Sequence, residues 1–66
     1  MNPAQRERYC SHVRGQMIEL MFILRMEARA EGRYLPLVRA REEAIDMLDH
    51  DDRMIAIEWL RMVGAR

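Results

Sequence analysis

The chain contains no lysine. All eleven of its basic residues are arginine, and they balance eleven acidic residues to give zero net charge with histidine neutral. Nucleic-acid-binding proteins gain most of their affinity by neutralising phosphates, so a neutral chain is not typical of that class. The arginine bias agrees with codon usage in a GC-rich genome. It also suits protein interfaces, because a planar guanidinium group offers several hydrogen-bond donors at once.

Cysteine, glycine and proline are also scarce, with one, three and two copies in 66 residues. A single cysteine, Cys10, forms no internal disulfide, which excludes the disulfide-stapled secreted class and favours a reducing compartment. So little glycine and proline excludes a collagenous or low-complexity chain. We therefore expect one small globular domain.

No long apolar run is present. The longest apolar stretch, Met17 to Leu24, is interrupted by Glu19, whereas a membrane-spanning helix needs about twenty apolar residues. The first sixteen residues are polar and lack the apolar region of a signal peptide. We therefore expect a soluble, cytoplasmic protein with no membrane partner.

Sequence motifs for catalysis are missing as well. There is no glycine-rich phosphate loop, no nucleophile elbow around the single serine and no CxxC pair. Asp46, Asp49, His50, Asp51 and Asp52 form an acidic cluster of a kind that binds divalent ions. Its spacing matches no calcium loop, and capping of a helix N-terminus explains the acids without a metal. We expect no enzymatic activity, no cofactor and no metal.

The first helix is predicted from its two ends. Asn2, Pro3 and Gln5 have the spacing of a capping box with proline at the first helical position. Gly32 suits the left-handed position after a helix end, and Pro36 prevents the helix from continuing. These signals predict a helix over about 3–31 and a turn over 32–36.

The rest of the chain is also helical in pattern. After Pro36, positions spaced alternately by three and four residues form a mostly apolar stripe, with six apolar residues out of eight. They are Val38, Arg41, Ile45, Leu48, Asp52, Ile55, Trp59 and Met62. The Asp-rich segment 49–52 crosses this stripe with residues that prefer caps to helix interiors. Either one helix kinks there, or two helices over about 36–48 and 51–63 meet with Asp49 or Asp51 as the cap; we favour the break.

Two helical arms of similar length joined by a short turn predict an all-α fold. We expect a single domain over 1–66, an antiparallel helical hairpin whose second arm is kinked or broken near 49–52. Between Met17 and Met26 the first helix is apolar on nearly all sides, and one hairpin partner covers only one of them. Because domains of this size bury only about 60% of their surface, we expect a homodimer resembling a four-helix bundle. The residues expected in the core or dimer interface are Val13, Met17, Leu20, Leu24, Ile45, Leu48, Ile55, Trp59 and Met62.

Two further sets are candidates for contact with partners. The second face of the first helix and the turn contribute apolar residues that a hairpin leaves exposed, and thioether side chains adapt to varied partners. The partner-binding candidates are Met21, Phe22, Met26, Tyr34 and Leu35. The candidates for electrostatic contact with the acidic segment of a second chain are Arg6, Arg8 and Arg14.

These features predict a small interaction module that binds a larger host or regulatory protein and modulates it by inhibition. In size, composition and architecture the chain resembles the accessory proteins with which phages and mobile elements inhibit host regulators. The alternative is a helical-hairpin regulator that binds an RNA loop or DNA. In length and plan the chain is similar to plasmid copy-number regulators that pair two hairpins on RNA loops; this alternative would use Arg6, Arg8, Arg14, Arg25 and Arg29.

Overall fold

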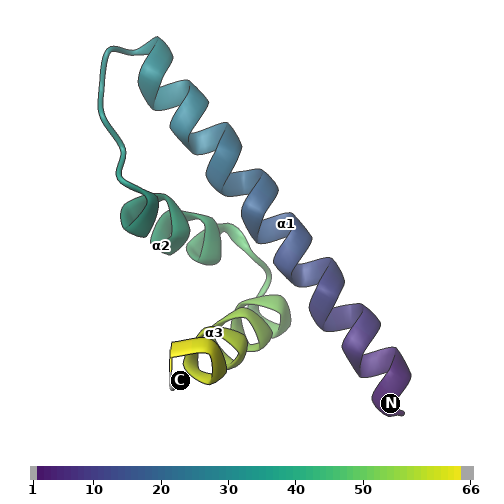
Figure 1. Ribbon diagram of the computed structural model, residues 1–66. Coiled ribbons are helices and arrows are strands. Elements are labelled where there is room, and N and C mark those ends of the chain that lie inside the picture. The colour runs from purple at the N-terminus through teal and green to yellow at the C-terminus, as the bar shows by residue number, and fades with distance from the viewer. Residues whose placement is uncertain (1, 65–66) are drawn as a thin grey trace.

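The computed structural model describes residues 2–64 as three α-helices, with no strand in that range. They are α1 (Pro3–Ala30), α2 (Leu37–Met47) and α3 (His50–Gly64). The long helix α1 runs the length of the molecule, and the two shorter helices lie on one side of it (Figure 1). The predicted all-α fold is confirmed.

Both ends of α1 have the predicted caps. Asn2 Oδ1 accepts a hydrogen bond from the Gln5 N–H at 2.8 Å, and Gln5 Oε1 accepts one from the Asn2 N–H at 3.2 Å. At the other end Gly32 has a φ of 75°, which glycine adopts without steric cost. The backbone there closes with the two hydrogen bonds of a Schellman motif.

The second arm is broken rather than kinked. Leu48 is extended, with φ −76° and ψ 154°, and α3 starts after Asp49, whose carbonyl accepts from the Arg53 N–H at 2.8 Å. The Arg53 side chain reaches back to the end of α2. Its Nη2 donates to the carbonyls of Asp46 and Leu48 at 3.0 and 3.2 Å. A guanidinium group of α3 thus caps the C-terminus of α2.

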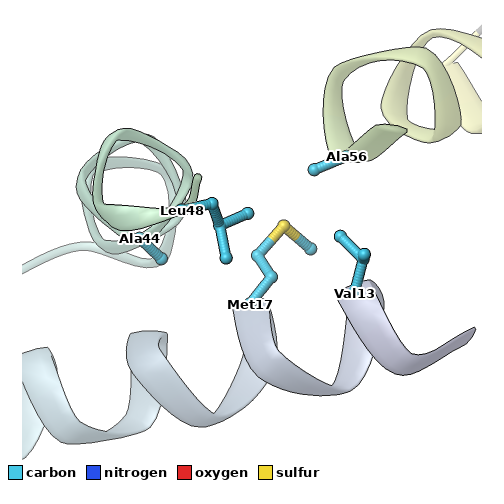
Figure 2. Packing of buried hydrophobic residues seen from close by; sticks show 5 residues of the cluster. All are labelled: Val13, Met17, Ala44, Leu48 and Ala56. Atoms are coloured by element: carbon cyan, nitrogen blue, oxygen red, sulfur yellow. The ribbon is translucent and has the colours of Figure 1, made fainter. Parts of the chain in front are cut away.

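The core is small and lies against the N-terminal and middle parts of α1. Among the described residues, the buried apolar ones are Val13, Met17, Ala28, Ala40, Ala44, Leu48 and Ala56. Figure 2 shows the central cluster, where side chains from all three helices converge. The partly buried residues packed around it are Tyr9, Leu20, Met21, Leu24, Ile45, Ile55 and Trp59. Met62, expected in the core or dimer interface, is exposed in the single chain.

The face of α2 that packs on α1 overlaps the predicted stripe but is centred closer to two alanines. Ala40 and Ala44 are fully buried, whereas Val38 is exposed and Ile45 is only partly buried. The stripe was identified from large apolar residues. The structure instead turns the alanines inward, because a side chain of one carbon lets two helix backbones approach closely. Ile45 and Leu48, which were predicted in the core, do pack there.

The molecule is elongated. Its extents are 45 × 23 × 17 Å and its radius of gyration is 13.1 Å, against about 10.8 Å for a compact domain of this length. The accessible surface is 5347 Å², against about 4,400 Å² for a typical compact protein of this mass. A substantial part of the surface, much of it apolar, is therefore left uncovered by the chain itself.

Candidate functional site: a groove at the tip of the molecule

A groove of about 760 Å³ lies where α1 extends beyond its contacts with α2. The segment between Gly32 and Pro36 runs back from the end of α1 toward the start of α2 (Figure 1). The groove is lined by residues of α1, by residues of this segment and by Leu37 at the start of α2. We call it the tip groove. Its lining residues are Ile18, Met21, Phe22, Arg25, Met26, Arg29, Gly32, Arg33, Tyr34, Leu35 and Leu37.

The wall formed by α1 carries a row of apolar side chains. Ile18, Phe22 and Met26 are four residues apart, so they stack on one face of the helix, and all three are more than half exposed. The opposite wall carries Tyr34, which is 83% exposed, and the partly buried Leu35. Exposed apolar side chains of this size, gathered in one concave surface, are typical of a binding site.

All five residues predicted to bind a partner line this groove. Met21, Phe22 and Met26 come from α1, and Tyr34 and Leu35 come from the connecting segment. The sequence pattern indicated that these side chains lack cover within a hairpin. The structure leaves Phe22, Met26 and Tyr34 exposed, covers Met21 and Leu35 in part, and brings all five to one concavity.

Three arginines also line the tip groove. Arg25, Arg29 and Arg33 follow one another at steps of four residues, and no acidic residue is among the lining side chains. Arg33 pairs with Glu31, with Nη2 and Oε2 2.6 Å apart. Within residues 2–64, neither Arg25 nor Arg29 forms an ion pair. The groove therefore combines an apolar surface with an excess of positive charge.

The sequence interpretation missed Arg33 and considered Arg25 and Arg29 only as part of a phosphate-binding strip. The sequence does show that the three arginines are four residues apart, but Arg33 lies beyond the end of α1. Helical spacing does not apply there, and the turn after Gly32 determines where the Arg33 side chain lies.

The three candidate electrostatic residues do not form one surface. Arg6 pairs with Glu58 of α3 at 3.1 Å, and the guanidinium of Arg14 lies 5.4 Å from the centre of the Trp59 ring. Arg8 is exposed and lies on nearly the opposite side of α1 from Arg6. Arg6 and Arg14 thus contact α3 of their own chain, where sequence reasoning had them meet a second chain.

A hydrogen bond not anticipated from sequence also joins α1 to α3. The Tyr9 hydroxyl donates to the carboxylate of Asp52. This hydrogen bond, with smaller contributions from burial and from the negative charges of Asp52, Asp51 and Asp49, raises the pKa of Tyr9 above its ordinary value. Asp52 therefore has a structural partner within the fold.

The acidic segment is used for structure in other ways too. Asp49 occupies the cap position before α3, and Asp51 lies in the first turn of that helix, where negative charge is favourable. Among residues 2–64, no three histidine, cysteine or acidic side chains come together as metal ligands would. The lining of the tip groove holds no carboxylate, imidazole or thiol. Its chemistry is therefore that of apolar contact and guanidinium hydrogen bonds.

Within the described part of the chain, no helix combines the length and the apolar character needed to cross a membrane. Comparison with protein-family models, with curated proteins and with solved structures found no match to the chain.

Proposed function

We propose that this protein is a small non-enzymatic interaction module that binds a larger protein through the tip groove and inhibits it. The observation that carries the proposal is the groove itself. It gathers the exposed side chains of Ile18, Phe22, Met26 and Tyr34 in a concavity of about 760 Å³. A concave apolar surface with a few polar groups is the usual form of a binding site.

The chemistry of the lining supports binding over catalysis. General acid–base or nucleophilic chemistry needs a carboxylate, imidazole, thiol or activated hydroxyl near a second such group. The tip groove offers three guanidinium groups and the Tyr34 hydroxyl among apolar side chains. Inhibition is the effect expected of a small chain that occupies a surface of its target without altering it chemically.

The active form in this proposal is a homodimer resembling a four-helix bundle. The exposed surface exceeds that of a compact protein of this mass by about 900 Å², and a stable interface covers about 800 Å² on each partner. Two large apolar side chains outside the groove, Met54 and Met62, lie eight residues apart on one side of α3, and both are more than half exposed. The second copy covers these residues, which leaves the tip groove free for the target.

The proposed setting is the cytoplasm of a bacterial host, with the chain acting as a phage or mobile-element accessory protein on a host regulator. The single cysteine supports a reducing compartment. The size, the arginine-only basic composition and the helical architecture support the accessory role.

One observation favours the alternative of RNA binding. Phe22 and Tyr34 are exposed aromatic rings beside three arginines, and single-stranded nucleic acid binds by stacking on such rings next to positive charge. Against it, the other apolar lining residues are aliphatic or thioether side chains on which bases do not stack. The zero net charge of the chain also disfavours phosphate binding.

The test is capture from lysate of the source cells, with and without nuclease treatment, using three forms of the tagged protein. They are the wild type, a groove variant with Phe22→Ala and Tyr34→Ala, and a control variant with Ile23→Ala and Val38→Ala. All four positions are exposed apolar residues, but Ile23 and Val38 do not line the groove. We expect the wild type and the control to retain one protein in stoichiometric amount, and the groove variant to lose at least about ten-fold of it.

Equal loss in the groove and control variants would contradict the role of the tip groove. Recovery of bound material only without nuclease would favour the RNA alternative.

A further inference from the structure

We infer that the ligand of the tip groove is an amphipathic helix of the target protein that carries acidic residues beside its apolar anchors. The inference rests on the proposed function and specifies the partner of the same site. It is carried by the composition of the lining, in which Arg25, Arg29 and Arg33 accompany apolar side chains and no acid is present.

The shape of the apolar surface fits a helix. Ile18, Phe22 and Met26 form a row on α1 whose ends are eight residue steps apart, which is about 12 Å or two helical turns. An amphipathic helix presents anchors at positions i, i+4 and i+7 over a similar distance, and grooves beside a helix are a common way of binding one. Tyr34 and Leu35 form the other wall, so a ligand helix would contact α1 on one side and the connecting segment on the other.

The charge of the lining specifies the polar residues of that helix. Within residues 2–64, Arg25 and Arg29 have no acidic partner, and only Arg33 is neutralised, by Glu31. A guanidinium group binds a carboxylate through two parallel hydrogen bonds. Asp or Glu next to the anchors would therefore be recognised by the geometry of these hydrogen bonds as well as by charge. Lysine or arginine at the same positions would be repelled.

Helix α2 of a second copy of this chain complements the groove less well. The exposed acids of α2 are Glu42, Glu43 and Asp46. Glu42 lies 3.9 Å from Arg39 of the same helix, and Arg39 shares the outward face with Asp46. The exposed apolar residues of α2 are Leu37, Val38 and Met47. They form no row like that of the groove, because Val38 and Met47 are nine residues apart and lie on opposite sides of the helix.

The experiment measures binding of two fluorescein-labelled designed peptides to the full-length protein by fluorescence anisotropy. Each is a helix of about 18 residues with leucines at i, i+4, i+7 and i+11. One peptide has glutamate at the flanking positions, and the other has lysine at the same positions. We expect the acidic peptide to bind at least about ten-fold more tightly at low salt.

Two charge-reversal variants locate the effect. The double variant Arg25→Glu, Arg29→Glu should reverse the preference in favour of the lysine peptide. The matched control, Arg8→Glu with Arg61→Glu, makes the same change in net charge at exposed positions outside the groove and should keep the preference for the acidic peptide.

Equal affinity for the two peptides would overturn the inference while leaving groove-dependent target capture intact. Binding of neither peptide, with target capture still lost in the Phe22, Tyr34 variant, would also overturn the inference but not the proposed function. Tighter binding of an oligouridine RNA than of the acidic peptide, abolished by the Arg25, Arg29 reversal, would overturn both. Loss of peptide binding as the protein dimerises would show that a second copy fills the groove and would overturn the inference.

Discussion

At the scale of single residues, very few side chains hold this fold together. Val13 is the only side chain larger than alanine that is fully buried among the described residues. Val13 was among the residues predicted from sequence to lie in the core or dimer interface. The polar contacts around it were not, because Tyr9–Asp52 and Arg14–Trp59 join residues more than forty positions apart. Local periodicity gives the face of a helix but not which side chain of a distant helix lies opposite.

The Tyr9–Asp52 hydrogen bond predicts a change of stability at high pH. Because the pKa of Tyr9 is raised in the folded protein, the folded state holds the phenol proton more tightly than the unfolded state does. The resulting stabilisation is fully present below the ordinary tyrosine pKa of about 10. It is lost as the pH rises through the higher pKa of the folded protein.

Titration of the tyrosine absorbance tests this in a Tyr34→Phe background, where Tyr9 is the remaining tyrosine. Asp52→Asn should lower the pKa of Tyr9 toward its ordinary value, because it removes the charge and the strongest acceptor. Asp46→Asn removes a carboxylate that does not contribute to the shift and should leave the titration unchanged. An unaltered titration in Asp52→Asn would contradict the assigned cause.

At the scale of elements, helix ends were more predictable than helix faces. The capping box at Asn2 and the left-handed Gly32 are local signals, and the aspartates of 49–52 marked a break for the same reason. The rotation of α2 that buries Ala40 and Ala44 depends on how closely two backbones approach. Hydrophobic periodicity is weighted by large residues, so it identified Ile45 and Leu48, which pack in the core, but not the two alanines beside them.

The capping role of Arg53 could not be predicted from sequence either, because it depends on how α3 is placed relative to the end of α2. This role predicts a specific loss of stability. Arg53→Met keeps the apolar stem but removes the donors to the carbonyls of Asp46 and Leu48. We expect a loss of about 1 kcal/mol in the free energy of unfolding, because the last carbonyls of α2 lose their charged donor. Urea unfolding followed by circular dichroism measures it. Arg8→Met, an exposed change of the same kind on α1, is the control. Equal effects of the two substitutions would argue against capping.

At the scale of the whole molecule, the excess of apolar surface was predictable but its shape was not. Counting apolar residues between Met17 and Met26 showed that one hairpin cannot cover them all. The tip groove exists because α1 continues beyond its contacts with α2 while the segment after Gly32 returns alongside it (Figure 1). How far that segment returns is a property of tertiary packing, and no residue pattern in the turn encodes it.

The exposed surface of α3 predicts the assembly state. Sedimentation equilibrium at micromolar concentration should give about 16 kDa, twice the chain mass of 7.9 kDa. The melting temperature should rise with protein concentration, because the dimer is the stabilised species.

Two pairs of substitutions locate the dimer interface. Met54→Lys with Met62→Lys should reduce the mass to that of one chain, since two charges would have to be buried in the interface. Both residues are exposed in the single chain, so the fold of each chain should survive. Phe22→Lys with Met26→Lys makes the same change in the tip groove and should leave the dimer intact. If the groove variant dissociates and the α3 variant does not, the second copy occupies the groove, and the separation of dimer and target surfaces is wrong.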